Sequence, residues 1–265
     1  VKRNPVLMIE LTPPHGSIKV KSSYYDLTVS EYNSIRDNIK DYLFIFSVLT
    51  GISLDEIPAY DLDEVAPFIS FLNEDPREME PLDFITINNK DFLDVSIFES
   101  SWANRITVKD LVLVIEPEDK DSEDEYLLTD IIELVSVYTT KQGKKFDYNK
   151  IQETRKVLDS MPVSEVYPFG IFLEKQLIEV CKLERKKLKS KYTADQLQAG
   201  IESFDELGVF NTIDMIMKEY GFDQHKALRQ EYSFIFNKLL LSNKTSKFEK
   251  RYAEILRNKN KHVEN

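Results

Sequence analysis

The chain has 265 residues, of which 42% are hydrophobic and 31% are charged, and its formal net charge is −11. This composition predicts a folded protein with a sizeable core and excludes an intrinsically disordered chain. No apolar run approaches the roughly 20 residues of a membrane-spanning helix, so we expect no membrane among its partners. The single cysteine excludes an internal disulfide and suits a reducing compartment.

The first predicted segment, residues 1–82, begins with a β-hairpin. Apolar and polar residues alternate over roughly 5–11 and 17–24, on either side of a Pro-Pro-His-Gly turn, which is typical of two paired strands. Thr28 precedes Glu31 by three residues, as in a capping box, so a helix is expected to begin there.

Further helices are expected in the same segment. The first helix is predicted to break within DNIKD, before the apolar run YLFIFSVLT, and Gly51 is a residue typical of the position after a helix end. Ser53 is expected to cap a short helix that ends at Pro58. The stretch DLDEVAPFISFLNE predicts another helix, closed before Pro76.

The second segment, residues 83–145, is predicted to repeat this layout in degenerate form. DFITINNKDFLDVSI alternates across NNK, which indicates another hairpin. The Thr-Val pair at 107–108 matches the pair at 28–29, and YLLTDIIELVSVYTTKQG matches the earlier apolar helix with its terminal Gly. Between them, EPEDKDSEDE carries seven acids in ten residues, which predicts an exposed loop.

The third segment, residues 146–265, shows helical periodicity throughout and no strand pattern. Asn211-Thr212 is expected to cap a helix that Gly221 ends, and Asp223 is expected to cap a long helix after it. The predicted class is therefore α+β, mostly α, with small N-terminal β-hairpin elements among helices and an all-helical C-terminal region.

Few residues in the sequence could carry catalysis. The three histidines have no metal-ligand spacing to one another or to the cysteine. Glycine-rich phosphate loops and the common nucleophile motifs are missing, and DKDSEDE lacks the central Gly of a calcium loop. We therefore expect no enzyme, no cofactor and no metal, with a hydrolase based on paired carboxylates as the remote alternative. The histidines are His15, His225 and His262.

Cysteine and tryptophan occur once each. Cys181 is interpreted as a small structural residue of a helix, and the alternative is a thiolate favoured by Lys182 and Arg185. Trp102 is expected to be a partly buried anchor between the second hairpin and the RITV that follows it.

The stretch NTIDMIMKEYGFDQHKALRQEY, residues 211–232, has the outline of a helix-turn-helix. A net charge of −11 opposes approach to phosphates, so an αα-hairpin inside a helical bundle is favoured and nucleic acid is not expected as a partner. A helix-turn-helix-like adaptor or DNA-binding regulator remains the alternative function. Its groove-facing residues would be Gln224, Lys226, Arg229 and Gln230.

Charge is divided unevenly along the chain. Residues 1–140 hold 11 Lys/Arg against 28 Asp/Glu, a balance of −17, and residues 141–265 hold 24 against 18, a balance of +6. Solvated faces explain this division, and the alternative is contact between copies or with a charged partner. The candidate partner-binding residues, expected to be exposed, are Lys186, Lys187, Lys189, Lys247, Lys250 and Arg251. The apolar residues among them, expected to point into the core, are Leu183, Leu188, Tyr192, Phe248, Tyr252, Ile255 and Leu256.

The order of hairpin, LTVSEY, LFIFSVLTGIS and LDEIPAYDLDEVAPFISFL resembles tail and baseplate assembly proteins of tailed bacteriophages. The closing pattern YGFDQHKALRQEYSFIFNKLLLSNKTSKFEKRYAEILRNKNK is similar to their helical C-terminus. The resemblance covers about half of the chain and leaves residues 83–145 unmatched. It implies a non-enzymatic, chaperone-like assembly protein or virion protein. Its partners would be other phage structural proteins or further copies of itself, in the host cytoplasm during assembly or in the virion.

Overall fold

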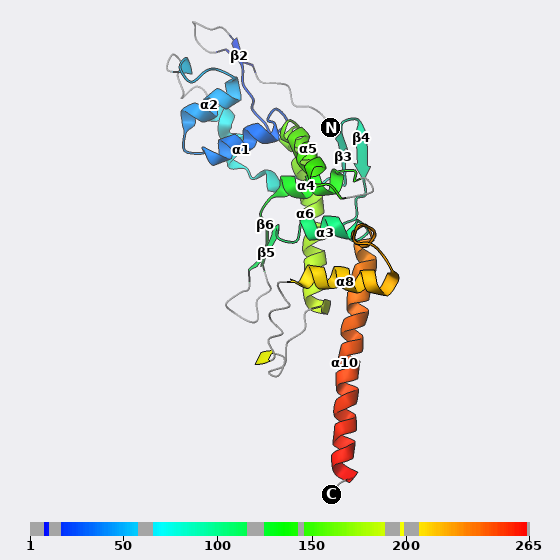
Figure 1. The fold of residues 1–265 in the computed structure, drawn as a ribbon. Coiled ribbons are helices and arrows are strands. Elements are labelled where there is room, and N and C mark those ends of the chain that lie inside the picture. The colour runs from blue at the N-terminus through cyan, green and yellow to red at the C-terminus, as the bar shows by residue number, and fades with distance from the viewer. Residues whose placement is uncertain are drawn as a thin grey trace. The chain divides into compact units, whose positions relative to one another are not determined.

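The computed structural model describes residues 8–10, 17–57, 66–115, 125–142, 146–188, 197–198 and 207–263. Helices dominate these ranges, which also contain three two-stranded antiparallel sheets (Figure 1). The predicted α+β, mostly helical class is therefore confirmed. Several predictions lie outside the described residues, including those for His15, Pro58, most of the acidic stretch, Lys189 and Tyr192.

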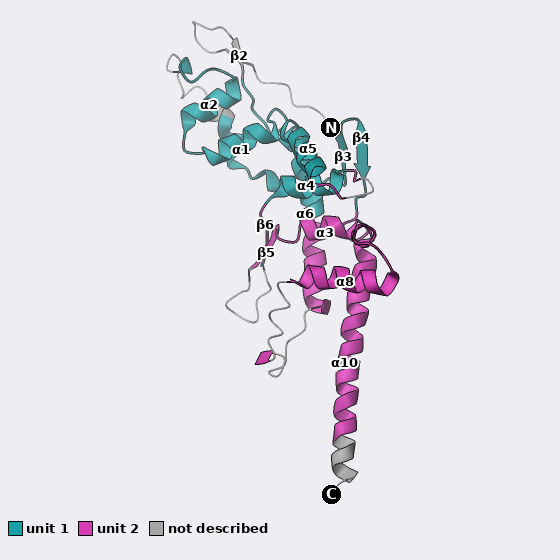
Figure 2. Ribbon diagram, viewed as in Figure 1, with its two compact units in different colours: residues 1–95, 130–140, 148–174 teal, residues 96–129, 141–147, 175–265 magenta. Residues whose placement is uncertain are grey.

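The chain forms two compact units, coloured separately in Figure 2. The first comprises Val1–Val95, Asp130–Thr140 and Tyr148–Glu174, and the second comprises Ser96–Thr129, Lys141–Asp147 and Lys175–Asn265. Each unit therefore draws on segments that are far apart in the sequence. The predicted second and third segments each contribute to both units.

The elements predicted at the start of the first unit are present. Strands β1 (Met8–Glu10) and β2 (Ser17–Lys19) pair antiparallel, and β2 is shorter than predicted because residues 20–24 lie outside it. Helix α1 (Val29–Asp37) begins with the predicted capping box. The Thr28 side chain accepts a hydrogen bond from the Glu31 amide at 3.2 Å, and the Thr28 amide donates to the Glu31 carboxylate at 3.0 Å.

Helix α2 (Tyr42–Thr50) ends as predicted at Gly51, whose φ of 73° is left-handed. Of the predicted short helix after Ser53, residues 54–56 form a turn in which the Asp55 amide donates to the Ser53 hydroxyl at 3.3 Å, and the buried Ile57 is in 3-10 conformation. Part of the next predicted helix is present as a 3-10 helix, η3 (Ala66–Asn73). A second 3-10 helix, η4, spans Pro76–Glu78.

The second predicted hairpin is confirmed. Strands β3 (Phe84–Ile87) and β4 (Lys90–Leu93) pair antiparallel through a two-residue turn. Asn88 and Asn89 have φ values of 50° and 58°. A tight hairpin of this kind needs two residues with positive φ, and asparagine tolerates that conformation better than most other residues.

The core of the first unit includes helices α4 (Ile131–Thr139) and α5 (Tyr148–Asp159) and the first half of α6 (Val163–Leu188). Every residue of α4 is buried, which explains its apolar character on all sides. A Cβ atom on Gly170 of α6 would lie 2.4 Å from Cγ1 of Ile131. Only glycine therefore allows this close approach of α6 to α4.

The match between the Thr-Val pairs at 28–29 and 107–108, on which the predicted repeat in residues 83–145 partly rests, does not hold in the structure. Thr28 starts a helix, whereas Thr107 is the last residue of helix α3 (Trp102–Thr107). Strands β5 (Val112–Ile115) and β6 (Glu125–Leu128) form a hairpin that the sequence did not predict, so YLL of the predicted helix belongs to a strand. Trp102 is 5% exposed, so it is buried more deeply than the partly buried anchor that the sequence predicts.

Helix α8 (Gly208–Tyr220) begins earlier than predicted and ends at Gly221, whose φ is 63°. Asn211 and Thr212 lie inside it and do not cap it. Asp223 caps a helix as predicted, but this helix, α9 (Gln224–Leu228), has only five residues.

The predicted long helix after Asp223 is divided because backbone groups between its two parts pair elsewhere. The Trp102 amide donates to the Gln230 carbonyl, and the Tyr232 amide donates to the Ser100 carbonyl, both at 2.8 Å. Because these two groups bond to residues 100 and 102, they do not make the hydrogen bonds that would continue the helix. The chain then forms α10 (Tyr232–Val263), a single helix of 32 residues.

We predict that Gly51→Val destabilises the first unit, whereas Gly51→Asn has a much smaller effect. No atom lies within 4 Å of a Cβ built on Gly51, so the cost comes from the left-handed backbone alone. That cost is about 1–2 kcal/mol for a β-branched residue and less for asparagine. Thermal denaturation should show a melting temperature lower by a few degrees for valine only. Equal melting temperatures for the two variants would contradict a left-handed helix end.

Candidate interaction surface

The C-terminal half of α10 is exposed along its whole described length. Every residue from 244 to 257 is exposed, and in Figure 2 this part of the helix stands clear of the other described elements of its unit. The first turns of α10 differ, because Tyr232, Ile235 and Phe236 are buried. The helix thus changes along its length from a packed element to an unpacked one.

The unpacked part carries large apolar side chains, which corrects the expectation that they point into the core. Phe248 is 67% exposed and Tyr252 is 53% exposed. Their rings stack on each other, with centroids 6.0 Å apart and an angle of 7° between the ring planes. We call the exposed apolar residues of α10 the apolar stripe; they are Leu241, Phe248, Tyr252, Ile255 and Leu256.

The spacing of the apolar stripe places its members along one side of the helix. Phe248 follows Leu241 by seven residues, and Ile255 follows Phe248 by seven. Tyr252 and Leu256 fall between or next to these positions at helical spacing. Periodicity alone predicts such an amphipathic helix, but it does not say whether the same chain supplies the covering surface.

The candidate basic residues are exposed where the structure describes them. This holds for Lys186 and Lys187 near the end of α6 and for Lys247, Lys250 and Arg251 on α10. Contact with a partner through these residues stays a prediction.

Asn243 links α10 to the end of α6 within the second unit. Its side-chain amide donates to the carbonyls of Lys187 at 3.2 Å and Leu188 at 3.1 Å, the last two residues of α6. Carbonyls at a helix end have no partner within their own helix, so Asn243 satisfies two of them. The end of α6 therefore lies against α10 at the point where the exposed part of α10 begins.

The start of α10 is held by a buried ion pair that sequence reasoning missed. Arg105 of α3, which is only 8% exposed, donates from Nε to Oε1 of Glu184 in α6 at 2.9 Å and from a second nitrogen to Oε2 at 2.5 Å. The hydroxyl of Tyr232, the first residue of α10, donates to the same carboxylate. One carboxylate thus ties α3 and α10 to α6. Residues 105 and 184 lie 79 positions apart, and local sequence patterns carry no signal of such a pair.

The ionisation of this cluster suits a structural role. Burial alone would lower the pKa of Arg105, but the hydrogen bonds and charge of Glu184 outweigh it and raise that pKa. Burial and the Glu184 carboxylate raise the pKa of Tyr232. Burial also raises the pKa of the Cys181 thiol, against the opposing effect of the nearby Arg105. A thiolate at Cys181, the alternative drawn from its basic neighbours, is therefore disfavoured.

A second charged cluster supports the first unit. Arg155 of α5 bonds Asp130 and Glu133 at 2.9 Å each, and Tyr148 donates to Glu133 at 3.1 Å. Asp130 also caps α4 by accepting from the Glu133 amide. Each carboxylate is thus occupied by structural bonds.

The groove-facing residues of the predicted helix-turn-helix make local contacts. Lys226 Nζ lies 4.1 Å from the centroid of the Phe222 ring. The side chain of Gln230 donates to the Lys226 carbonyl at 3.0 Å. With α9 limited to five residues, the second helix lacks the length of a recognition helix, so the structure gives no support to the DNA-reading alternative.

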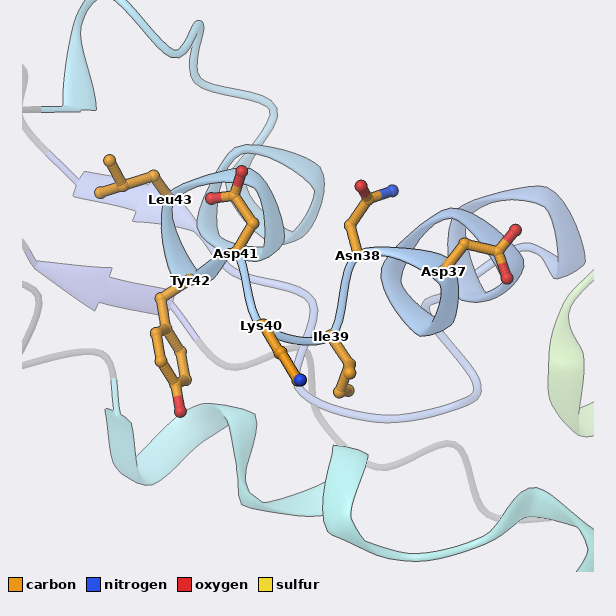
Figure 3. A pocket seen from close by; sticks show the side chains of 7 residues that line it. All are labelled: Asp37, Asn38, Ile39, Lys40, Asp41, Tyr42 and Leu43. Carbon is orange, nitrogen blue, oxygen red and sulfur yellow. The ribbon is translucent and has the colours of Figure 1, made fainter.

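An open hollow lies at the turn between α1 and α2, as Figure 3 shows. Its polar side chains are used locally, because Asp41 caps α2 and Asp37 pairs with Arg36 at 3.4 Å. Its lining also includes Ile39, Tyr42 and Leu43. Asn38 and Lys40 complete the lining, and the Asn38 amide donates to the Ser34 carbonyl at 2.9 Å.

Within the ranges that the structure describes, no group of three or more His, Cys, Asp and Glu side chains is arranged to hold a metal ion. Nor does any helix there combine the length and apolar character needed to cross a membrane.

Comparisons with known proteins give no relatives. No family model matches the chain, and neither a curated protein nor a solved structure is similar to it at a significant level.

We predict that Glu184→Ala destabilises the protein far more than Glu179→Ala, although both lie in α6. Removing Glu184 leaves the buried Arg105 charge unpaired, which costs about 3–5 kcal/mol. Glu179 pairs with Lys182 on the exposed surface, and such pairs contribute roughly 0–1 kcal/mol. Urea denaturation of both variants measures the difference. Similar midpoints would show that the buried ion pair is not needed.

We also predict that the Cys181 thiol reacts slowly with iodoacetamide at neutral pH. A raised pKa leaves less thiolate, which is the reactive form. Reaction should accelerate when urea unfolds the protein, as mass spectrometry of the modified chain would show. A native rate that equals or exceeds the rate in urea would instead indicate an activated thiolate.

Proposed function

We propose that this protein is a non-enzymatic assembly protein that acts through protein–protein contacts made by α10. The exposed apolar stripe is the observation that carries this proposal. Contiguous apolar side chains on an otherwise charged surface are typical of a site that another surface covers. Basic residues on the same helix would add charge complementarity and increase the rate of association.

The energetics of helices support the same conclusion. A lone helix in water is only marginally stable, and most helical stability in proteins comes from packing of an amphipathic face. From residue 244 to 257, α10 has no such packing within the described chain, and no ion pair joins its described side chains to one another. A surface that covers the stripe, on another protein or on a further copy of the chain, would supply the missing stabilisation.

The setting that we propose is tail or baseplate building in a tailed bacteriophage. It rests on the resemblance of the N-terminal and C-terminal sequence patterns to phage assembly proteins. The partners would be other phage structural proteins with acidic surfaces, met in the host cytoplasm during assembly. The charge asymmetry of the chain fits this role, because the basic residues of α10 would attract such a surface.

The test is a triple charge reversal on α10, Lys247→Glu, Lys250→Glu and Arg251→Glu. A matched control reverses the equally exposed Lys40, Lys150 and Lys156 of the first unit. Each variant would be supplied to cells infected by the encoding phage after deletion of the gene, and tailed particles would be counted by electron microscopy.

The α10 variant should yield far fewer tailed particles than the wild type or the control. The Cys181→Ala protein should work as well as the wild type, because no catalytic cysteine is proposed. Normal particle counts with the α10 variant, or normal tails without the gene, would refute the proposed function.

A further inference from the structure

We propose that the apolar stripe is covered by the same helix of a second copy of this chain, so that two α10 helices pair in parallel as a short coiled coil. This goes beyond the proposed function and stands without it, because it concerns self-association and not the assembly partner. The proposal rests on the spacing of the exposed residues, on their flanking charges and on the unpacked state of the helix.

The exposed residues follow the heptad pattern of a coiled-coil seam. Leu241, Phe248 and Ile255 recur every seven residues, which places them at one seam position, d. Thr245 and Tyr252 each lie four residues after a d residue and three before the next, at the other seam position, a. All five are exposed, so the whole seam is open to a partner.

The seam pattern is self-complementary, because each layer meets its own equivalent when two copies align. The chain upstream of the seam is already packed, as Phe236 and Ile235 are buried in the second unit. The pairing would therefore begin near Leu241, where α10 leaves the packed part of its own unit.

Flanking charges select the parallel orientation. Lys244 lies at the g position and Glu249 at the e position, and both are exposed. In a parallel pair, the residue at position g of one helix lies next to the residue at position e of the other helix, five positions further along the sequence. Lys244 of each copy therefore lies next to Glu249 of the other copy, which gives two such pairs in the dimer. An antiparallel pair would instead place flanks of like charge together, Arg251 near Arg251 and Glu249 near Glu249, which is unfavourable.

Several basic residues point away from the seam. Lys247 falls at position c, and Lys250 and Arg257 fall at position f, on the outer side of the pair. Pairing would leave them exposed and would present two basic faces instead of one. Their mutual repulsion weakens the pair, so we expect a reversible dimer whose population depends on concentration.

The first experiment is sedimentation equilibrium of the full chain across a wide concentration range. The wild type should pass from monomer to dimer, and the seam variant Phe248→Asp with Ile255→Asp should stay monomeric. The outward variant Lys247→Glu with Lys250→Glu lies on the same helix and should still dimerise. A wild type that is monomeric throughout, or a seam variant that still dimerises, would overturn the proposal.

A charge exchange tests the orientation. Lys244→Glu and Glu249→Lys should each weaken the dimer, since each places like charges together, and the double variant should restore it towards the wild type. In an antiparallel pair neither single change would weaken association, so that result would overturn the parallel arrangement. If the wild type is monomeric while the seam variant fails to support tail assembly, the stripe is covered by another protein; the proposed function then holds and self-pairing does not.

Discussion

A buried charge must be paired, and this requirement fixes where α10 begins. Arg105 is almost completely buried, so its guanidinium needs the Glu184 carboxylate as a partner. The hydroxyl of Tyr232 donates a hydrogen bond to the same carboxylate. Three helices of the second unit, α3, α6 and α10, meet at this carboxylate. Because desolvation makes an unpaired charge costly, the first turn of α10 has little freedom to move. Asn243 adds a second attachment three turns later, at the end of α6.

Beyond Asn243 the opposite condition holds, since nothing in the described chain packs against α10. A helix that is packed over its first turns and unpacked beyond them presents its outer side chains at a defined position to another molecule. The apolar stripe supplies area for burial, and the basic residues supply charge for attraction. The buried carboxylate of Glu133 and the half-buried carboxylate of Glu184 both serve structural bonds. The exposed stripe and the basic residues beside it are the features on which the proposed function through contact rests.

Local patterns in the sequence predicted local structure well. The capping box at Thr28, the left-handed Gly51 and the Asn88-Asn89 turn all depend on residues within a few positions of one another. Features that depend on distant contacts were missed or misjudged. The Arg105–Glu184 pair spans 79 positions, and α9 stops short because residues 230–232 bond to residues 100–102. The candidate site was predicted in part: the basic residues of α10 are exposed as expected, but the apolar residues beside them face solvent, since periodicity marks an apolar face without saying what covers it.

The central claim is that the outer half of α10 gains its stability from pairing with the same helix of a second copy of the chain. Amide hydrogen exchange of residues 244–257, measured by mass spectrometry at low and high protein concentration, tests this most directly. The account predicts fast exchange in dilute protein and growing protection as concentration rises, while residues 232–243 stay protected throughout. Exchange in residues 244–257 that is independent of concentration, whether fast or slow, would contradict it.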